Sequence, residues 1–199
     1  MILVQRSESV RILKVRTKFN KLMVLPTAYL PPLSYMQALM REPATIEQME
    51  TFEKQTFRNR CTICKPSAIS NQPSERIILT VPVKKVEHKQ LTRDIEISYQ
   101  SRWQHQHWIT LVSAYQHTPY FLYFADYLRP FYEKEYKWLL DLNDEMNETI
   151  ASLLRREKPQ IVESGKWKVE RTSDWSGEIW TDKHPWQTEL SVLDTLFED

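Results

Sequence analysis

Hydrophobic positions in the first quarter of the chain fall into a short run and then into helical spacing. Residues 21–25 form an apolar run that stops at a proline, which predicts a buried strand. In residues 33–41 the apolar positions are three or four apart and prolines stand on both sides, which predicts a helix. Residues 44–49 can form a second strand. A strand, a helix and a strand of these lengths predict a parallel, right-handed crossover.

The later pattern predicts two more strands and then mainly helices. Residues 76–83 are rich in β-branched side chains, and residues 95–99 alternate between polar and apolar side chains, as strands do. Residues 103–116 carry apolar side chains on one helical face. Residues 138–154 have the amphipathic spacing of a long surface helix.

The end of the chain has a different pattern. Polar residues and four tryptophans follow residue 159, until a last apolar turn at residues 190–197. The predicted fold class is therefore α/β: a single domain with a mostly parallel, Rossmann-like sheet in the amino-terminal part, helices from residue 103 to 156, and an irregular, tryptophan-rich carboxy-terminal extension. Residues 1–20 would be an arm or edge strand, residues 21–158 the core, and residues 159–199 an extension that packs on it.

Composition excludes several classes of function. A formal net charge of +1 gives no global field to attract nucleic acid, so no nucleic-acid partner is expected. No run of about 18 apolar residues occurs, and charges interrupt the amino-terminal apolar residues, so we expect no integral membrane segment and a cytoplasmic protein. Gly165 and Gly177 are the only glycines, too few for a Walker A loop or a dinucleotide-binding turn.

The two cysteines, Cys61 and Cys64, are too few for a disulfide framework, which agrees with a reducing compartment. Their spacing matches half of a zinc knuckle or a redox pair. However, the chain has no second half of a knuckle and no helix start here to activate a thiol. We interpret both as buried structural cysteines.

Two of the five histidines lie in the stretch RWQHQHW, residues 102–108. On a strand, His105 and His107 would share a face and could bind one metal ion, whereas on a helix they diverge by roughly 200°. The apolar spacing predicts the start of a helix, and Ile109 and Leu111 offer no further ligand, so no metal site is predicted. A single histidine acting as an acid or base remains open.

A polar cluster of Gln55, Arg58, Asn59 and Arg60 precedes the cysteines. Guanidinium and amide groups at this density suit the recognition of a carboxylate or a phosphate. The alternative is a solvated turn held by salt bridges. The sequence leaves both interpretations open.

Six sequence blocks occur in the same order as in the WbqC-like family, which the chain resembles from about residue 24 to residue 199. The blocks are YLPP (29–32), KQTFRNRC (54–61), LTVPV (79–83), WQHQHW (103–108), SAYQHTPYF (113–121) and LSVLDTLF (190–197). In relatives the tryptophan block has the form W-x-x-x-H, so His107 is the matching histidine and His105 is replaceable. The pair Asn59 and Arg60 also recurs.

The resemblance implies a role in the synthesis of bacterial O-antigen and other surface polysaccharides. A glycine or aminoacyl transfer onto an amino sugar has been suggested for the family. The first hypothesis is therefore an acyl or aminoacyl transferase whose partners are a nucleotide- or lipid-linked sugar and an acyl or aminoacyl donor. The identity of any cofactor is unknown, and a homodimer is left open.

Under this hypothesis His107 is the general base toward the sugar amine. Asn59 and Gln55 complete the predicted catalytic set, because their amides would orient the substrate or stabilise the developing oxyanion. The predicted substrate-binding residues would hold a phosphate or carboxylate or line the pocket at the end of the first strand, where open parallel sheets place their ligands. They are Tyr29, Arg58, Arg60, Trp103 and His105.

Two alternatives belong to other classes. The first is a non-catalytic protein of the same pathway that binds a sugar or nucleotide and serves in assembly. The second is a divergent nucleotidyltransferase-like enzyme, because Pro26-Thr27-x-Tyr29 is similar in placement to the first strand, loop and helix of nucleotidyltransferases of the pantothenate synthetase type. Their His-x-Gly-His motif is missing, since Pro31, Pro32 and Ser34 occupy that stretch.

Overall fold

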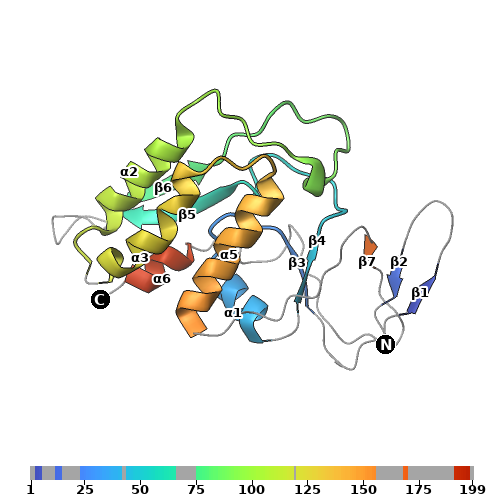
Figure 1. Ribbon diagram of the computed structural model, residues 1–199, viewed down its shortest axis with the longest axis horizontal. Helices are drawn as coiled ribbons and strands as arrows, with labels where there is room; N and C mark the ends of the chain where they lie inside the picture. The colour runs from blue at the N-terminus through green and yellow to red at the C-terminus, as the bar shows by residue number, and fades with distance from the viewer. Residues whose placement is uncertain are drawn as a thin grey trace.

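The computed structural model has a mixed α/β fold (Figure 1). It describes residues 3–5, 12–14, 23–41, 44–65, 75–118, 120–155, 168–169 and 191–197. Most of the predicted arm, residues 1–20, and most of the tryptophan-rich extension, residues 159–199, lie outside the described residues. The predictions for those two parts therefore stay predictions.

The first described unit is the predicted parallel crossover. Strands β3 (Met23–Pro26) and β4 (Ala44–Glu47) pair in parallel, and α1 (Leu33–Arg41) connects them. All four residues of β3 are buried, as expected for an apolar run without alternation. The helix begins directly after two prolines, whose fixed φ suits a first helical turn.

The mostly parallel, Rossmann-like sheet is not confirmed. Strands β5 (Arg60–Lys65) and β6 (Glu75–Thr80) form an antiparallel pair of their own, apart from the β3–β4 pair. Buried and less buried residues alternate along β5 from Arg60 to Cys64, which is typical of an antiparallel strand with only one covered face. A third small sheet joins β1 (Leu3–Gln5), β2 (Ile12–Lys14) and β7 (Lys168–Val169).

The predicted strand at residues 95–99 is wrong. Glu96 and Ile97 make only isolated bridges, to Trp138 and Val83 respectively. The alternation of this segment arises because Ile95 and Ile97 both point into the core, where each is at most 2 % exposed. One buried face was present, but no neighbouring strand was available to pair along it.

The remaining regular elements of the described fold are helices. They are η1 (Thr92–Asp94), α2 (Trp103–Tyr115), α3 (Phe121–Leu128), α4 (Pro130–Glu133), α5 (Leu139–Arg155) and α6 (Val192–Phe197). The predicted helices at residues 33–41, 103–116 and 138–154 are confirmed within a residue or two at each end. Helix α5 packs on α1, while α2 and α6 both pack on β5 (Figure 1).

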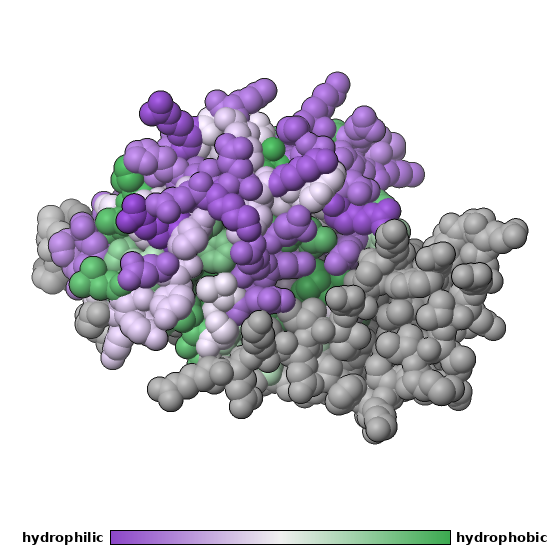
Figure 2. Space-filling view, viewed as in Figure 1, coloured by the Kyte–Doolittle hydropathy of each residue, from purple (hydrophilic) through white to green (hydrophobic). Residues whose placement is uncertain are grey.

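Two buried asparagines of α5 fix the loop that directly follows β3. The Asn143 amide donates to Thr27 Oγ1 (3.0 Å) and to the Arg58 carbonyl (2.8 Å), and the Asn147 amide donates to the Ala28 carbonyl (2.9 Å). These bonds fix the backbone just before Tyr29 and the start of β5. The core beneath is apolar, while hydrophilic side chains cover most of the described surface in the space-filling view (Figure 2).

Candidate functional site

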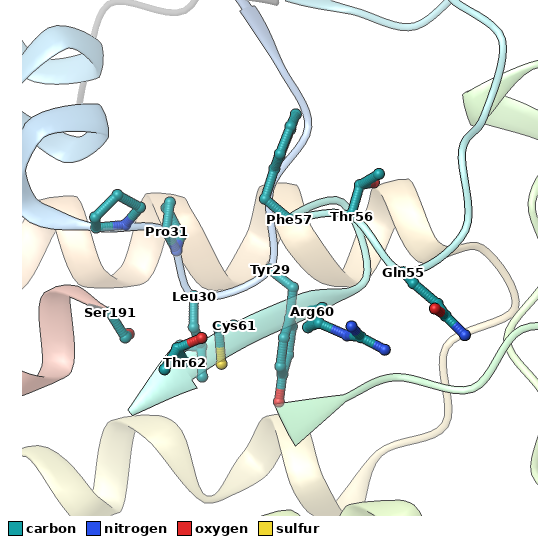
Figure 3. Close-up of a pocket in the computed structure, with 11 residues that line it drawn as sticks. Tyr29, Leu30, Pro31, Gln55, Thr56, Phe57, Arg60, Cys61, Thr62 and Ser191 are labelled. Carbon is teal, nitrogen blue, oxygen red and sulfur yellow. The ribbon is translucent and has the colours of Figure 1, made fainter. Parts of the chain in front are cut away.

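A cavity of about 260 Å³ lies where β3 ends. The loop after β3, the loop before β5, the first half of β5 and the residue before α6 form its walls (Figure 3). These four segments are far apart in the sequence. The lining residues are Tyr29, Leu30, Pro31, Pro32, Gln55, Thr56, Phe57, Arg60, Cys61, Thr62 and Ser191.

Two lining residues have left-handed backbone conformations although neither is glycine. Leu30 has a φ of 43° and Gln55 a φ of 62°. Such conformations cost about 1–2 kcal/mol for a residue with a Cβ and tend to occur at functional sites. The hydrogen bond from the Tyr29 amide to the Phe57 carbonyl (3.0 Å) ties these two loops together. Two of the three left-handed non-glycine residues in the described part of the chain thus line one cavity, and the third, Lys89, does not.

The two arginines of the polar cluster have opposite environments. Arg58 is 1 % exposed, and its Nε and Nη2 each donate to one oxygen of the Glu50 carboxylate at 2.6 Å. Arg60 lines the cavity and donates from Nε to Thr80 Oγ1 at 3.1 Å, with no carboxylate paired to it among the described residues. Arg60 therefore brings an unneutralised positive charge to the cavity, whereas Arg58 does not.

Tyr29 connects the cavity to His107. Its ring forms part of the cavity wall, and its hydroxyl lies 2.9 Å from Nδ1 of His107 and 3.0 Å from the hydroxyl of Tyr132. Trp103 packs edge-on against the imidazole, with ring centroids 5.2 Å apart. His107 does not itself line the cavity, and the Tyr29 hydroxyl joins it directly to the cavity wall.

His107 is neutral at physiological pH. Burial lowers the pKa of its imidazole from 6.5 to about 4, while a hydrogen bond to the backbone of Thr80 raises it to a lesser extent. A backbone bond that raises a histidine pKa is one in which the ring donates to a carbonyl. With that proton on the nitrogen facing Thr80, Nδ1 is an acceptor, and the hydroxyl of Tyr29 donates to it.

The thiol of Cys61 is an inert part of the wall. Burial and the nearby Asp194 carboxylate raise its pKa far above the usual value for a thiol. A nucleophilic cysteine needs a lowered pKa, so the cavity does not activate this one. Cys61 and Cys64 are both free thiols. Cys61 is buried, as predicted, whereas Cys64 is only half-buried.

The carboxy-terminal helix α6 closes one end of the cavity. The Ser191 amide donates to the Thr62 carbonyl and the Val192 amide donates to the Pro31 carbonyl, each at 2.8 Å. Asp194 accepts from the Cys64 amide and from the Tyr115 hydroxyl, each at 2.7 Å. These bonds bind α6 to β5, to the loop after β3 and to α2, and they place the Ser191 side chain in the wall.

Five of the predicted site residues do not line the cavity. Besides His107 and the ion-paired Arg58, Asn59 is buried and its amide donates to the Val81 carbonyl at 2.9 Å, so it fastens β5 to the end of β6. Trp103 supports the imidazole from behind. His105 is exposed, on the side of α2 away from His107, because residues two apart on a helix diverge.

The remaining predicted residues, Tyr29, Gln55 and Arg60, do meet at the cavity. Sequence reasoning missed Thr62, Ser191 and Tyr132. Thr62 lies two positions after Arg60, so the alternation of a strand would have placed both side chains on one face had β5 been predicted. Nothing in the local sequence of Ser191 or Tyr132 indicated that they reach this site.

Among the residues with described side chains, no three His, Cys, Asp or Glu residues are placed to hold a metal ion. No described helix has the length and apolar character needed to cross a membrane.

A family model described as the WbqC-like protein family matches residues 27–184, which is more than half of the chain. This match includes every lining residue of the cavity except Ser191. No curated protein and no solved structure matches the chain.

Proposed function

The chain belongs to the WbqC-like protein family, and we propose that it transfers an acyl or aminoacyl group, such as glycine, onto the amine of a nucleotide- or lipid-linked sugar in bacterial surface polysaccharide synthesis. The observation that carries the proposal is the contrast between Arg58, neutralised by Glu50, and Arg60, unneutralised at the cavity. A guanidinium without a carboxylate in a cavity wall suits an anionic ligand. The phosphate of a linked sugar is such a ligand.

Gln55 is the second polar group on the Arg60 side. Its carboxamide is exposed, has no partner among the described residues, and extends to the same side as the Arg60 guanidinium (Figure 3). Its NH₂ can donate to a phosphate oxygen or to the oxyanion that forms when an amine attacks an acyl carbonyl. The proposal assigns this role to Gln55 alone, because the NH₂ of Asn59 already donates to the Val81 carbonyl.

The proton of the attacking amine has one route to a base. In the transfer, the amine nitrogen bonds to the carbonyl carbon of an activated ester or thioester donor, and the bond from that carbon to the leaving group breaks. The amine proton passes to the Tyr29 oxygen while Tyr29 gives its own proton to Nδ1 of His107. The leaving group then takes up the proton, which restores neutral His107.

A non-catalytic binding protein is the second candidate, and one observation favours it. Burial lowers the pKa of His107 to about 4, so its neutral imidazole is a weak base at physiological pH. A site built only to bind a sugar phosphate would need Arg60 and no reactive base. The two candidates share the ligand and differ in whether a covalent product forms.

The test is a transfer assay with the purified protein, UDP-glucosamine and a panel of acyl and aminoacyl thioesters, with products detected by mass spectrometry. We expect an acylated sugar with the natural chain and about 10²-fold slower formation with His107→Gln. His105→Gln, two positions away and exposed, is the matched control and should keep full activity. Full activity of His107→Gln would exclude it as the base, and binding without any product would favour the second candidate.

A further inference from the structure

The cavity has two polar ends. Arg60 and Thr62 are two positions apart on β5, so their side chains point to the same face and are separated by about 7 Å along the strand. Arg60 and Gln55 extend toward one side, while Thr62 and Ser191 lie on the other, with Tyr29 and Cys61 between them (Figure 3). One end is cationic, and at the other end the polar side chains of Thr62 and Ser191 are hydroxyl groups beside Leu30 and Pro31 (Figure 3).

The hydroxyl of Ser191 is directed by its own hydrogen bond. Its oxygen accepts from the Leu193 amide at 3.3 Å, which leaves the hydroxyl proton as a donor without an acceptor among the described residues. Ser191 is 2 % exposed, and its side chain helps to line the cavity. A buried donor of this kind favours a ligand that can accept from it.

Thr62 offers a second hydroxyl at the same end. Its side chain lines the cavity and has no hydrogen-bond partner in the part of the chain that the structure describes. The bond from the Ser191 amide to the Thr62 carbonyl fixes the two residues side by side. Two neighbouring hydroxyls suit the hydroxyl groups of a sugar ring, which both donate and accept.

We propose that the cavity binds a sugar phosphate in one direction, with the phosphate against Arg60 and Gln55 and the sugar ring against Thr62 and Ser191. Naming a sugar rests on the proposed function, whereas the direction follows from the two ends of the cavity. A hexose 1-phosphate matches this arrangement because it carries its phosphate and its far hydroxyls at opposite ends. Thr62 and Ser191 are therefore the proposed specificity-determining residues for the sugar.

Calorimetric titration of the full chain with glucosamine 1-phosphate, inorganic phosphate and glucosamine tests the proposed direction of binding. Thr62→Val keeps the volume and removes the hydroxyl, and it should weaken glucosamine 1-phosphate binding about three- to tenfold without changing phosphate binding. Ser191→Ala should act in the same way. Because Ser191 Oγ also accepts from the Leu193 amide at the start of α6, this variant can in addition destabilise the helix, whereas Thr62→Val leaves that bond in place. Arg60→Gln should weaken both anionic ligands about tenfold or more.

Ser152→Ala on α5 is the matched serine control, since Ser152 bonds to the Thr149 carbonyl and does not line the cavity. Equal affinity of glucosamine 1-phosphate and inorganic phosphate, or no effect of either hydroxyl variant, would overturn the proposed direction. So would the absence of any binding. Directional binding without transfer would leave this inference intact and count against the transferase, so the two failures are distinguishable.

Discussion

The hydroxyl of Tyr29 lies 2.9 Å from Nδ1 of His107, although 78 positions separate the two residues. This contact joins the loop after β3 to helix α2 and connects the buried imidazole to a residue of the cavity wall. The Tyr29 hydroxyl lies within hydrogen-bond distance of both Tyr132 and His107, so it is in the middle of a hydrogen-bond chain. The chemistry proposed for the site depends on this relationship.

Tyr29→Phe should therefore reduce transfer while leaving the cavity in place. Loss of the hydroxyl interrupts the route to His107, and we expect kcat to fall about 10²-fold with little change in KM for the sugar. Tyr132→Phe removes only the outer member of the chain and should cost less than about tenfold. Steady-state kinetics of both variants checks this, and an equal loss from the two would show that Tyr29 is a packing residue.

The buried imidazole predicts an acid-sensitive stability. The folded-state pKa of His107 is about 4, below the unfolded value of about 6.5, so the unfolded chain binds more protons between these limits. Stability is fully present above about pH 6.5 and is lost as the pH falls toward 4. Between pH 7 and pH 5 this group should remove about 2 kcal/mol from the free energy of unfolding.

Asp144 acts in the opposite direction in part of the same range. Burial and the nearby Asp141 and Glu148 raise its pKa to about 7, so its contribution to stability is lost as the pH rises from about 4 to 7. The comparison of the natural chain with His107→Gln removes this background because both carry Asp144. In urea unfolding, lowering the pH from 7 to 5 should therefore change the free energy of unfolding by about 2 kcal/mol less favourably in the natural chain than in the variant. Equal pH dependence would contradict the assignment.

Arg58 and Arg60 should separate stability from binding. Arg58→Ala removes a buried guanidinium that makes two hydrogen bonds to the largely buried Glu50 carboxylate, and should lower the free energy of unfolding by about 3 kcal/mol. Arg60→Ala removes a side chain at the cavity wall with no carboxylate partner in the described part, and should cost less than about 1 kcal/mol. Chemical denaturation of the two variants measures the difference. Similar losses would mean that Arg60 is also structural.

The left-handed backbone of Gln55 predicts that a glycine at this position increases stability but weakens ligand binding. Gln55→Gly should raise the free energy of unfolding by up to about 1 kcal/mol, because glycine adopts a φ near 62° without a Cβ clash. The same change removes a carboxamide from the Arg60 end of the cavity and should weaken sugar phosphate binding. Lys89→Gly, at another left-handed position away from the cavity, should stabilise the chain without affecting binding.

The local spacing of apolar residues was sufficient to predict part of the candidate site. Helical spacing after residue 103 separated His107 from His105, because residues two apart on a helix cannot share a face. The same spacing did not reveal that His107 lies behind Tyr29. That relation depends on how α2 packs against β5, which is a tertiary contact between distant segments.

The sequence also could not distinguish the roles of Arg58 and Arg60. Their identical chemistry gave no reason to prefer one, and the partner that removes Arg58 from consideration is Glu50, outside the cluster. Strand alternation would have paired Arg60 with Thr62, but the charged ends of β5 concealed the strand. The predicted Rossmann-like sheet was not confirmed for a similar reason, because apolar runs indicate strands without indicating which strands pair.

The affinity of UDP-glucosamine for the natural chain and for Arg60→Gln tests the central claim most directly. Calorimetry should show binding by the natural chain and a loss of about 10- to 100-fold in the variant, the usual range for one charge-assisted bond to phosphate. Arg76→Gln, on the exposed face of β6, should bind as the natural chain does. Unchanged affinity in Arg60→Gln, or no binding by the natural chain, would contradict an anion-binding substrate site at this cavity.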